Sequence, residues 1–247
     1  MSYGVFAGYY DFFTANVDYI AYAQRIDKII RSLGLKRGSL VDLGCGTASL
    51  SLELAKLGYS VTGIDISCEM LSAAAQKVRK SDRNVRLINQ DISMLELDKK
   101  YDVFVCSLDG INHLPGLDEV AKTFTRVRKY ISRRGVFIFD VNTIYKHRHI
   151  LADNCFIFDS DKAYLGWQND YNRSDNSVDI TLDFFIPQRD GGYARHTEQF
   201  REMAYSAKTM FETLDKCGFR VIGAYDGLSE DKPNAKTERI LFAAIRK

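Results

Sequence analysis

The sequence predicts an α/β protein with a doubly wound, mostly parallel sheet of seven strands and an inserted antiparallel β meander. Short apolar segments alternate with segments of helical period from about residue 39 to residue 141, which is typical of consecutive βαβ units. Residues 154–205 lack a helical period and read as strands between turn clusters. A helical segment and two apolar strands follow, so the parallel sheet is predicted to be interrupted and then completed.

Hydrophobic period and local end signals predict each element in chain order. Residues 15–34 are predicted to form an amphipathic helix that Gly34 ends, and Ser67 is predicted to be a helix N-cap. The core strands are predicted at residues 39–44, 60–65, 84–91, 101–108 and 135–141, with helices over 48–58, 67–79 and 117–130. The meander strands are predicted at 155–160, 163–171, 178–186 and 193–203, followed by a helix over 206–217 and strands at 219–226 and 237–247.

The stretch LVDLGCGTASLSLELAKLGYSVTGIDIS, residues 40–67, predicts a nucleoside site. Gly44 and Gly46 follow a strand directly, and glycine there lets the backbone take positive φ and lie against a ligand. Asp65 ends the next strand, where a carboxylate can accept hydrogen bonds from both hydroxyls of a ribose. Position 49 is Ser, so the third glycine of a dinucleotide site is missing. Taken one at a time, the glycines also suit simple packing and the aspartate an N-cap.

The motifs VDLGCGTA, GIDIS and QDI together resemble the signature of class I S-adenosylmethionine-dependent methyltransferases, which have a Rossmann-like sheet. The resemblance covers residues 40–141 and the last three elements. It implies the cofactor S-adenosylmethionine (SAM) and the product S-adenosylhomocysteine (SAH). Ala48 stands where the family often has a third glycine.

The resemblance also implies roles for individual residues. Asp42 would orient the methionyl ammonium, Asp65 would hold the ribose, and Asp91 would contact the adenine amino group. The resemblance implies that seven further residues contact the cofactor, namely Gly44, Cys45, Gly46, Ile66, Met70, Ile92 and Leu108.

The segment CSLDGINHLPG, residues 106–116, follows the fourth strand, where the acceptor would meet the cofactor. It lacks the D/N-P-P-[YF] motif of enzymes that methylate adenine amines or glutamine amides. SLDGINHL and the insertion are similar to small-molecule N-methyltransferases of nucleotide-linked amino sugars, and more loosely to glycine N-methyltransferases. On that resemblance His113 would lie beside the acceptor and take a proton from an ammonium group. The alternative is that His113 only closes the loop.

Tyr10 would be a lid over the cofactor on the same resemblance, and its alternative role is to anchor the first helix. Four residues of the meander are further candidates for the acceptor pocket, namely Tyr164, Trp167, Arg195 and His196. The basic stretches RVRKYISRR and KHRH are expected to be solvated, the second as a loop.

The resemblance and the element map divide the chain into four parts. They are a helical lid over residues 1–37, a SAM-binding core over 38–150, an inserted β cap over 151–205 and the completion of the core over 206–247. The predicted function is methyl transfer from SAM to a small molecule, at nitrogen. The alternatives are an RNA or protein methyltransferase and a non-catalytic protein that binds SAM or SAH.

Composition limits the partners. The net charge of the 247 residues is +2, without the basic bias of nucleic-acid or membrane-surface proteins, and no apolar run approaches the ~20 residues of a membrane span. Five scattered cysteines without C-x-x-C spacing, and an N-terminal stretch without signal-peptide features, favour a cytoplasmic protein without a metal site. The expected partner is a small-molecule acceptor, with a homodimer through the exposed edge of the cap as a further expectation.

Overall fold

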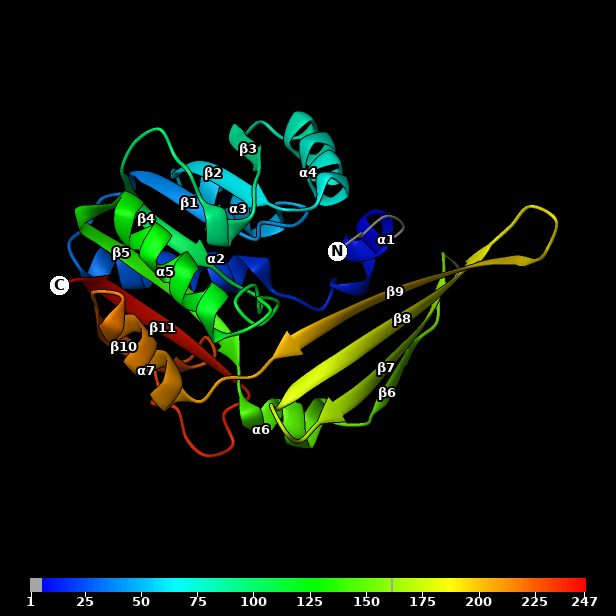
Figure 1. Ribbon diagram of the computed structural model, residues 1–247. Coiled ribbons are helices and arrows are strands. Elements are labelled where there is room, and N and C mark those ends of the chain that lie inside the picture. Colours follow the sequence, from blue (N-terminus) through cyan, green and yellow to red (C-terminus); the bar gives the residue numbers. More distant parts are fainter. Residues whose placement is uncertain (1–5, 161) are drawn as a thin grey trace.

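The computed structural model describes residues 6–160 and 162–247 (Figure 1). Within them the larger sheet has seven strands in the order β10-β11-β5-β4-β1-β2-β3. These are β1 (Ser39–Leu43), β2 (Ser60–Asp65), β3 (Val85–Asn89), β4 (Tyr101–Cys106), β5 (Ile131–Asn142), β10 (Phe219–Asp226) and β11 (Arg239–Arg246). β1 to β5 pair in parallel, whereas β11 runs antiparallel to both β5 and β10. The predicted mostly parallel sheet of seven strands is confirmed.

The second sheet contains four consecutive antiparallel strands of the described chain. They are β6 (Cys155–Phe158), β7 (Tyr164–Asn172), β8 (Ser177–Pro187) and β9 (Tyr193–Met203). In Figure 1 this sheet projects to the right of the larger one. The predicted antiparallel meander is therefore confirmed.

Several helix ends follow the predicted local signals. The helices are α1 (Phe6–Phe13), α2 (Tyr19–Ser32), α3 (Ser49–Lys56), α4 (Cys68–Lys80), α5 (Leu117–Tyr130), α6 (Ile144–Lys146) and α7 (Ala207–Lys216), with the 3-10 helix η1 (Ile92–Met94) and the π-helix η2 (His147–Leu151). Ser67 caps α4 by accepting a hydrogen bond from the Met70 N–H at 3.1 Å. Gly34 follows α2 with φ 72°, the left-handed conformation that glycine takes at a helix end.

Two segments differ from the prediction. Residues 15–34 do not form one helix, because α2 begins at Tyr19, where the Asp18 side chain accepts a hydrogen bond from the Ala21 N–H. Residues 144–151, which include KHRH, were predicted as a loop and instead form α6 and η2. The Thr143 hydroxyl caps this segment and His147 is fully buried. Burial of a polar residue leaves no hydrophobic period in the sequence, so the prediction was wrong there.

The seven-stranded sheet is buried on both faces. Along β5, Phe137 and Phe139 pack with α5 and α7, whereas the alternate residues Val136 and Ile138 pack with α2 and α3. This follows from the two-residue period of a strand. Helices on both faces leave the ends of the strands as the open edge of the sheet.

α1 lies between the larger sheet's α4 and the second sheet (Figure 1). Its Ala7 is buried in one hydrophobic cluster with Met70 of α4 and Leu165 of β7. The Phe13 ring lies 5.6 Å from the Phe184 ring, centroid to centroid. The N-terminal helix is thus held by apolar contacts from both sides of the gap that it spans.

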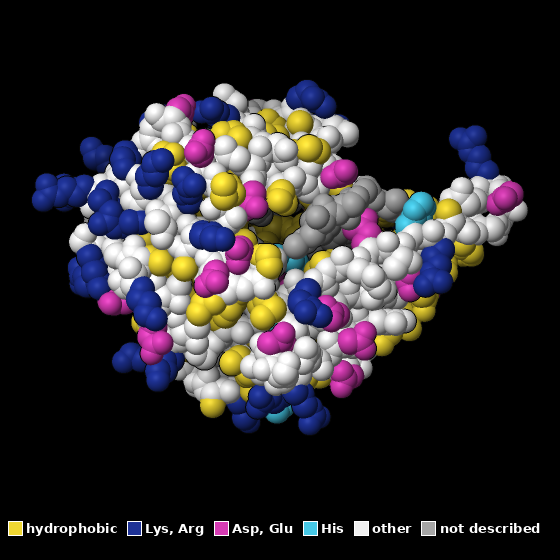
Figure 2. Space-filling model, viewed as in Figure 1, with side chains coloured by type: hydrophobic (Ala, Val, Ile, Leu, Met, Phe, Trp, Pro, Cys, Tyr) yellow, Lys and Arg dark blue, Asp and Glu magenta, His cyan; other side chains and the backbone are white. Residues whose placement is uncertain are grey.

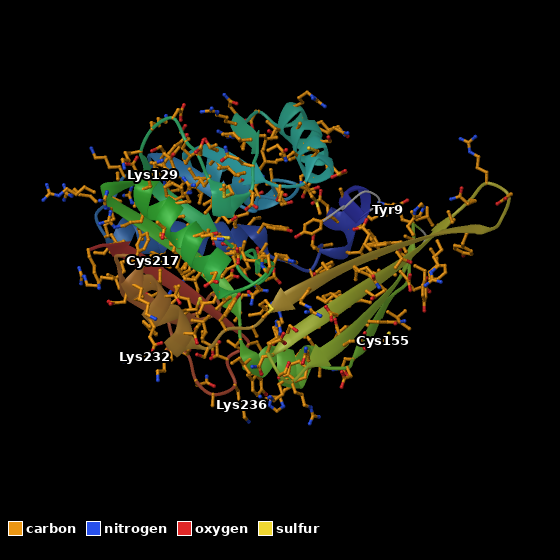
Figure 3. All side chains as sticks on the ribbon, in the orientation of Figure 1. Tyr9, Lys129, Cys155, Cys217, Lys232 and Lys236 are labelled. Carbon is orange, nitrogen blue, oxygen red and sulfur yellow. The ribbon has the colours of Figure 1, made fainter. Side chains whose placement is uncertain are left out.

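Basic side chains are most numerous on one side of the surface in the view of Figure 2. Figure 2 shows many Lys and Arg side chains on the left of the view, away from the second sheet, and Figure 3 places Lys129 there. The five cysteines are free thiols, and Cys155 and Cys217 lie far apart in Figure 3. In residues 6–160 and 162–247, no helix has the length and apolar character needed to cross a membrane.

Candidate active site

One cavity of about 520 Å³ lies where the strand ends of the core meet α1 and the second sheet. A side pocket of about 40 Å³ adjoins it through shared wall residues. The predicted residues that line the main cavity are Tyr10, Gly44, Gly46, Asp65, Ile66, Met70, Asp91, Ile92, Leu108 and His113. Asp42 and Cys45 line the side pocket. The fold therefore brings all twelve predicted site residues to one place.

The turn after β1 has the predicted backbone conformation. Gly44 and Gly46 have φ of 69° and 53°, in the left-handed region that favours glycine. A Cβ on Gly46 would meet no atom within 4 Å, so the backbone there borders open space. Ala48 also has positive φ, 64°, where the family often has glycine.

Asp65, at the end of β2, is fixed by backbone groups. The Gly46 N–H donates to its Oδ2 at 2.8 Å and the Ser67 N–H donates to its Oδ1 at 2.9 Å. The side chain is buried, and burial raises the pKa of Asp65 above its usual range. Each oxygen keeps a further acceptor site. A ligand hydroxyl in the cavity would therefore meet a carboxylate that is already in position.

Asp91 follows β3 and caps η1, because the Ser93 N–H donates to its Oδ1 at 2.7 Å. Asp91 also lines the cavity beside Ile92. The same carboxylate can therefore cap η1 and contact a ligand. Ile66 lines the same region from the end of β2 and Met70 from α4.

Asp42, near the end of β1, is a buried carboxylate. The Ser51 hydroxyl donates to its Oδ2 at 2.6 Å. Burial raises the pKa of Asp42 to about 7, against the opposing effect of the Ser51 hydrogen bond. A cationic ligand group in the side pocket would stabilise the ionised form.

Asp42 gives a prediction about pH. If it meets the methionyl ammonium, SAH affinity should decrease as the pH falls through about 7, and binding near that pH should release protons. Calorimetric titration of SAH in buffers of different ionisation enthalpy measures both effects. Asp42→Asn should bind more weakly and lose this pH dependence. An unchanged pH dependence in the variant would assign it to another group.

The stability of the ligand-free protein is expected to change with pH in the opposite direction to the SAH affinity. The folded state binds the Asp42 proton more tightly than the unfolded state, so this group's contribution to the free energy of unfolding falls as the pH rises from 3.8 to about 7. Asp42→Asn is therefore expected to raise the thermal midpoint of the ligand-free protein at neutral and higher pH.

The loop after β4 is held by a residue that the sequence interpretation missed. Leu108 and Asp109 have positive φ, and their N–H groups donate to the two oxygens of Asp140 at 2.9 Å each. Arg239 Nη1 donates to Asp140 at 2.6 Å and Nη2 to Asp109 at 3.4 Å. A lone aspartate inside the apolar strand GVFIFDV was the available signal, because a buried charge needs a partner.

The other end of the cavity lies under the second sheet. The His113 ring lies 5.2 Å from the Phe200 ring of β9, centroid to centroid, with the two planes tilted by 49°, and His113 Nε2 lies 3.9 Å from Glu202 Oε1. Asp109, Lys146, Glu202 and Arg239 also line this end, and sequence interpretation identified none of the four. Apolar walls come from Phe13, Phe158, Leu165, Trp167, Leu182 and Phe200.

Of the four meander candidates, Trp167 lines the cavity. Tyr164, Arg195 and His196 are not among its described lining residues, so those interpretations were wrong. Tyr164 and Trp167 lie three residues apart on β7, so their side chains point to opposite faces of the second sheet. Arg195 of β9 donates two hydrogen bonds, at 3.0 Å and 2.9 Å, to Asp183 of β8.

A polar cluster ties α1 to the glycine turn. Lys77 Nζ on α4 donates to Asp11 at 2.9 Å and 2.8 Å and to Ser49 Oγ at 2.6 Å. The Thr47 hydroxyl donates to Asp11 Oδ1 at 2.6 Å. Because Tyr10 lies next to Asp11 and lines the cavity, these contacts position the residue predicted as a lid.

Lys77→Met is expected to weaken SAH binding up to about fivefold, the loss that a partly exposed ion pair allows. Lys56→Met, which removes an exposed pair with Glu53 on α3, is the matched control and should leave SAH affinity unchanged. Equal affinities of the two variants in calorimetric titration would show that this cluster does not affect the cofactor end.

The residues present fit a cofactor with an adenosyl and a methionyl part. The backbone at Gly46 borders open space, Asp65 offers acceptor sites for hydroxyls, and Asp42 is a buried carboxylate that a cationic ligand group would stabilise. The cavity volume is within the ~300–1,000 Å³ of small-molecule sites.

Comparisons with known proteins agree with this geometry. Residues 40–135 match the model of a family described as "Methyltransferase domain". A Geobacillus sp. (strain WCH70) protein classed with the methyltransferases is 30% identical over 245 residues, which cover 99% of each chain. A crystal structure of a SAM-dependent methyltransferase from Clostridium acetobutylicum ATCC 824 has a TM-score of 0.88 and 31% identity, and covers 96% of each chain.

A sugar N-methyltransferase from Streptoalloteichus sp. ATCC 53650 has a TM-score of 0.78 over 96% of this chain and 92% of its own. Its identity of 17% shows a shared fold. The Geobacillus and Clostridium proteins are similar to this chain over nearly its whole length and at 30% identity or more. The chain therefore belongs to the class I SAM-dependent methyltransferases.

Proposed function

We propose that this methyltransferase transfers the methyl group to a nitrogen atom of a small molecule bound under the β cap. The observation that carries the proposal is the continuous cavity that joins the glycine turn to β7, β8 and β9. Its volume of about 520 Å³ must hold both cofactor and acceptor, which favours a small acceptor. The similarity in fold to a sugar N-methyltransferase also supports a nitrogen acceptor.

In this proposal the cofactor lies along the ends of β1, β2 and β3. Asp42 binds the methionyl ammonium, Asp65 the ribose hydroxyls and Asp91 the adenine amino group. The remaining contacts come from Gly44, Cys45, Gly46, Ile66, Met70, Ile92 and Leu108. SAM supplies a methyl group on a positively charged sulfur.

The protein contributes alignment, exclusion of water and removal of a proton. Residues 1–37 act as the lid, with Tyr10 over the cofactor, and 151–205 as the cap on the acceptor side. Residues 38–150 and 206–247 form the core that holds the cofactor. His113 accepts the proton that an ammonium acceptor loses before its nitrogen can attack.

The test combines labelled SAM with a cell extract separated by size. Label is expected in the small-molecule fraction, as one added methyl group on an amine detected by mass spectrometry. His113→Gln should bind SAH normally and transfer methyl more slowly. Label in RNA or protein, or on hydroxyl oxygen, would overturn the proposed acceptor. No transfer despite SAH binding would favour a non-catalytic SAM/SAH-binding protein.

A further inference from the structure

Glu202, on the last strand of the second sheet, is a buried carboxylate with a fixed position in the cavity wall. The Asn142 amide donates to its Oε2 at 3.0 Å and to Asp109 Oδ2 at 3.1 Å. The Asn142 backbone N–H in turn donates to Asn112 Oδ1 at 2.8 Å. The position of Glu202 is therefore set by the end of β5 as well as by its own strand.

His147 lies on the far side of the same carboxylate. Its Nδ1 is 2.9 Å from the Asn176 carbonyl, and since a carbonyl only accepts, this nitrogen carries a hydrogen. Its Nε2 lies 3.6 Å from Glu202 Oε2, a contact that is attractive when this nitrogen is also protonated. Burial alone would raise the pKa of Glu202, but His147, His113 and the Asn142 hydrogen bond outweigh burial and lower the pKa. These neighbours therefore favour the ionised form of Glu202.

The second oxygen of Glu202 faces His113 at the cavity. The distance of 3.9 Å between Glu202 Oε1 and His113 Nε2 exceeds a hydrogen bond. The other carboxylates that interact with His113 are Asp65 on β2 and Asp109 on the loop after β4.

The nearby cations have other partners. Arg239 is paired with Asp140 and Asp109, and Lys146 Nζ donates to Asn142 Oδ1 at 3.0 Å. Because Arg239 and Lys146 already bind other acceptors, Glu202 Oε1 is the buried carboxylate oxygen at this end of the cavity that a cationic group of a ligand would meet.

We infer that Glu202 and His113 together form the binding subsite for the ammonium group of a cationic alkylamine acceptor with an apolar body. Glu202 Oε1 binds the charge, and the aromatic and aliphatic side chains of β6 to β9 contact the body. This inference rests on the proposed function and names the acceptor class for it. This subsite would also bind amines in preference to alcohols. An alcohol would bury the ionised carboxylate from water without providing the positive charge that compensates for the burial.

An acceptor R–NH₃⁺ gives one proton to His113 Nε2 and becomes R–NH₂. The nitrogen lone pair then forms the N–C bond to the methyl carbon, the S–C bond breaks, and its electron pair remains on sulfur. The products are R–NH₂⁺–CH₃ and SAH, and His113 returns the proton to solvent.

Benzylamine and benzyl alcohol are matched probes, because they differ in charge and share the apolar ring. In the presence of saturating SAH, the wild type is expected to bind benzylamine at least about tenfold more tightly, as one charge-assisted hydrogen bond allows. Glu202→Gln should reduce this ratio to about two or less. Its SAH affinity should be unchanged, which also shows that the variant is folded.

Glu202→Asp provides a second variant, because it keeps the charge beside His147 and withdraws it from His113 by one methylene. Its amine preference should fall between those of the wild type and Glu202→Gln. Glu212→Gln, at an exposed position on α7, should keep the full preference. A wild type without amine preference, or an SAH-binding Glu202 variant that retains it, would overturn the inference. Absence of SAH binding by the wild type would instead contradict the cofactor assignment beneath the proposed function.

Discussion

Asp65→Ala is expected to weaken SAH binding at least about 100-fold, or about 3 kcal/mol, because two charge-assisted hydrogen bonds to the ribose would be lost. The structure adds a second cause. The Gly46 and Ser67 N–H groups both donate to this carboxylate, so its removal also leaves the glycine turn without its support. Calorimetric titration of SAH into the purified variant measures the loss.

Asp82→Ala is a suitable control, since Asp82 is an exposed aspartate paired with Arg83 next to it in the chain. It should bind SAH like the wild type. Asp65→Asn separates the two causes, because it keeps the side-chain volume and one carbonyl acceptor and should lose less than Asp65→Ala. A folded Asp65→Ala variant with nearly unchanged affinity would remove Asp65 from the cofactor site.

Asp140→Asn is expected to lower the free energy of unfolding by about 3–5 kcal/mol, the cost of breaking a buried ion pair. Asp140 is fully buried and accepts from the Leu108 and Asp109 N–H groups and from Arg239. The variant leaves the Arg239 guanidinium with Asp109 at 3.4 Å. The thermal midpoint should fall by about 10 °C for a chain of this size, measured by calorimetry or circular dichroism.

Asp98→Asn is the matched control, because Asp98 and Arg86 form an aspartate–arginine pair at 3.1 Å that is more than half exposed on both sides. Its free energy of unfolding should change by less than about 1 kcal/mol. Adding Arg239→Met to Asp140→Asn should recover part of the stability, since the unpaired charge is then gone. Similar losses for Asp98→Asn and Asp140→Asn would show that Asp140 does not carry a buried charge.

The conformation of the glycine-turn end of the cavity was predictable, because the residues that determine it lie close to one another in the chain. Gly44 and Gly46 lie in a turn whose conformation depends on the glycines themselves, and Asp65 ends the next strand. Ser67 caps α4 through a residue three positions away. Local conformation and strand period determine such features before any tertiary contact forms.

Local sequence signals were thus sufficient for the order and type of the core elements, the glycine turn and the aspartates at the strand ends. The end of the cavity under the second sheet depends on tertiary contacts, because Asn142 meets Glu202 across 60 positions there and Arg239 meets Asp109 across 130. The two-residue period of β7 shows that Tyr164 and Trp167 point to opposite faces, but not which face turns inward. That choice depends on how the second sheet packs against α1 and the core, through contacts between segments that no local pattern connects.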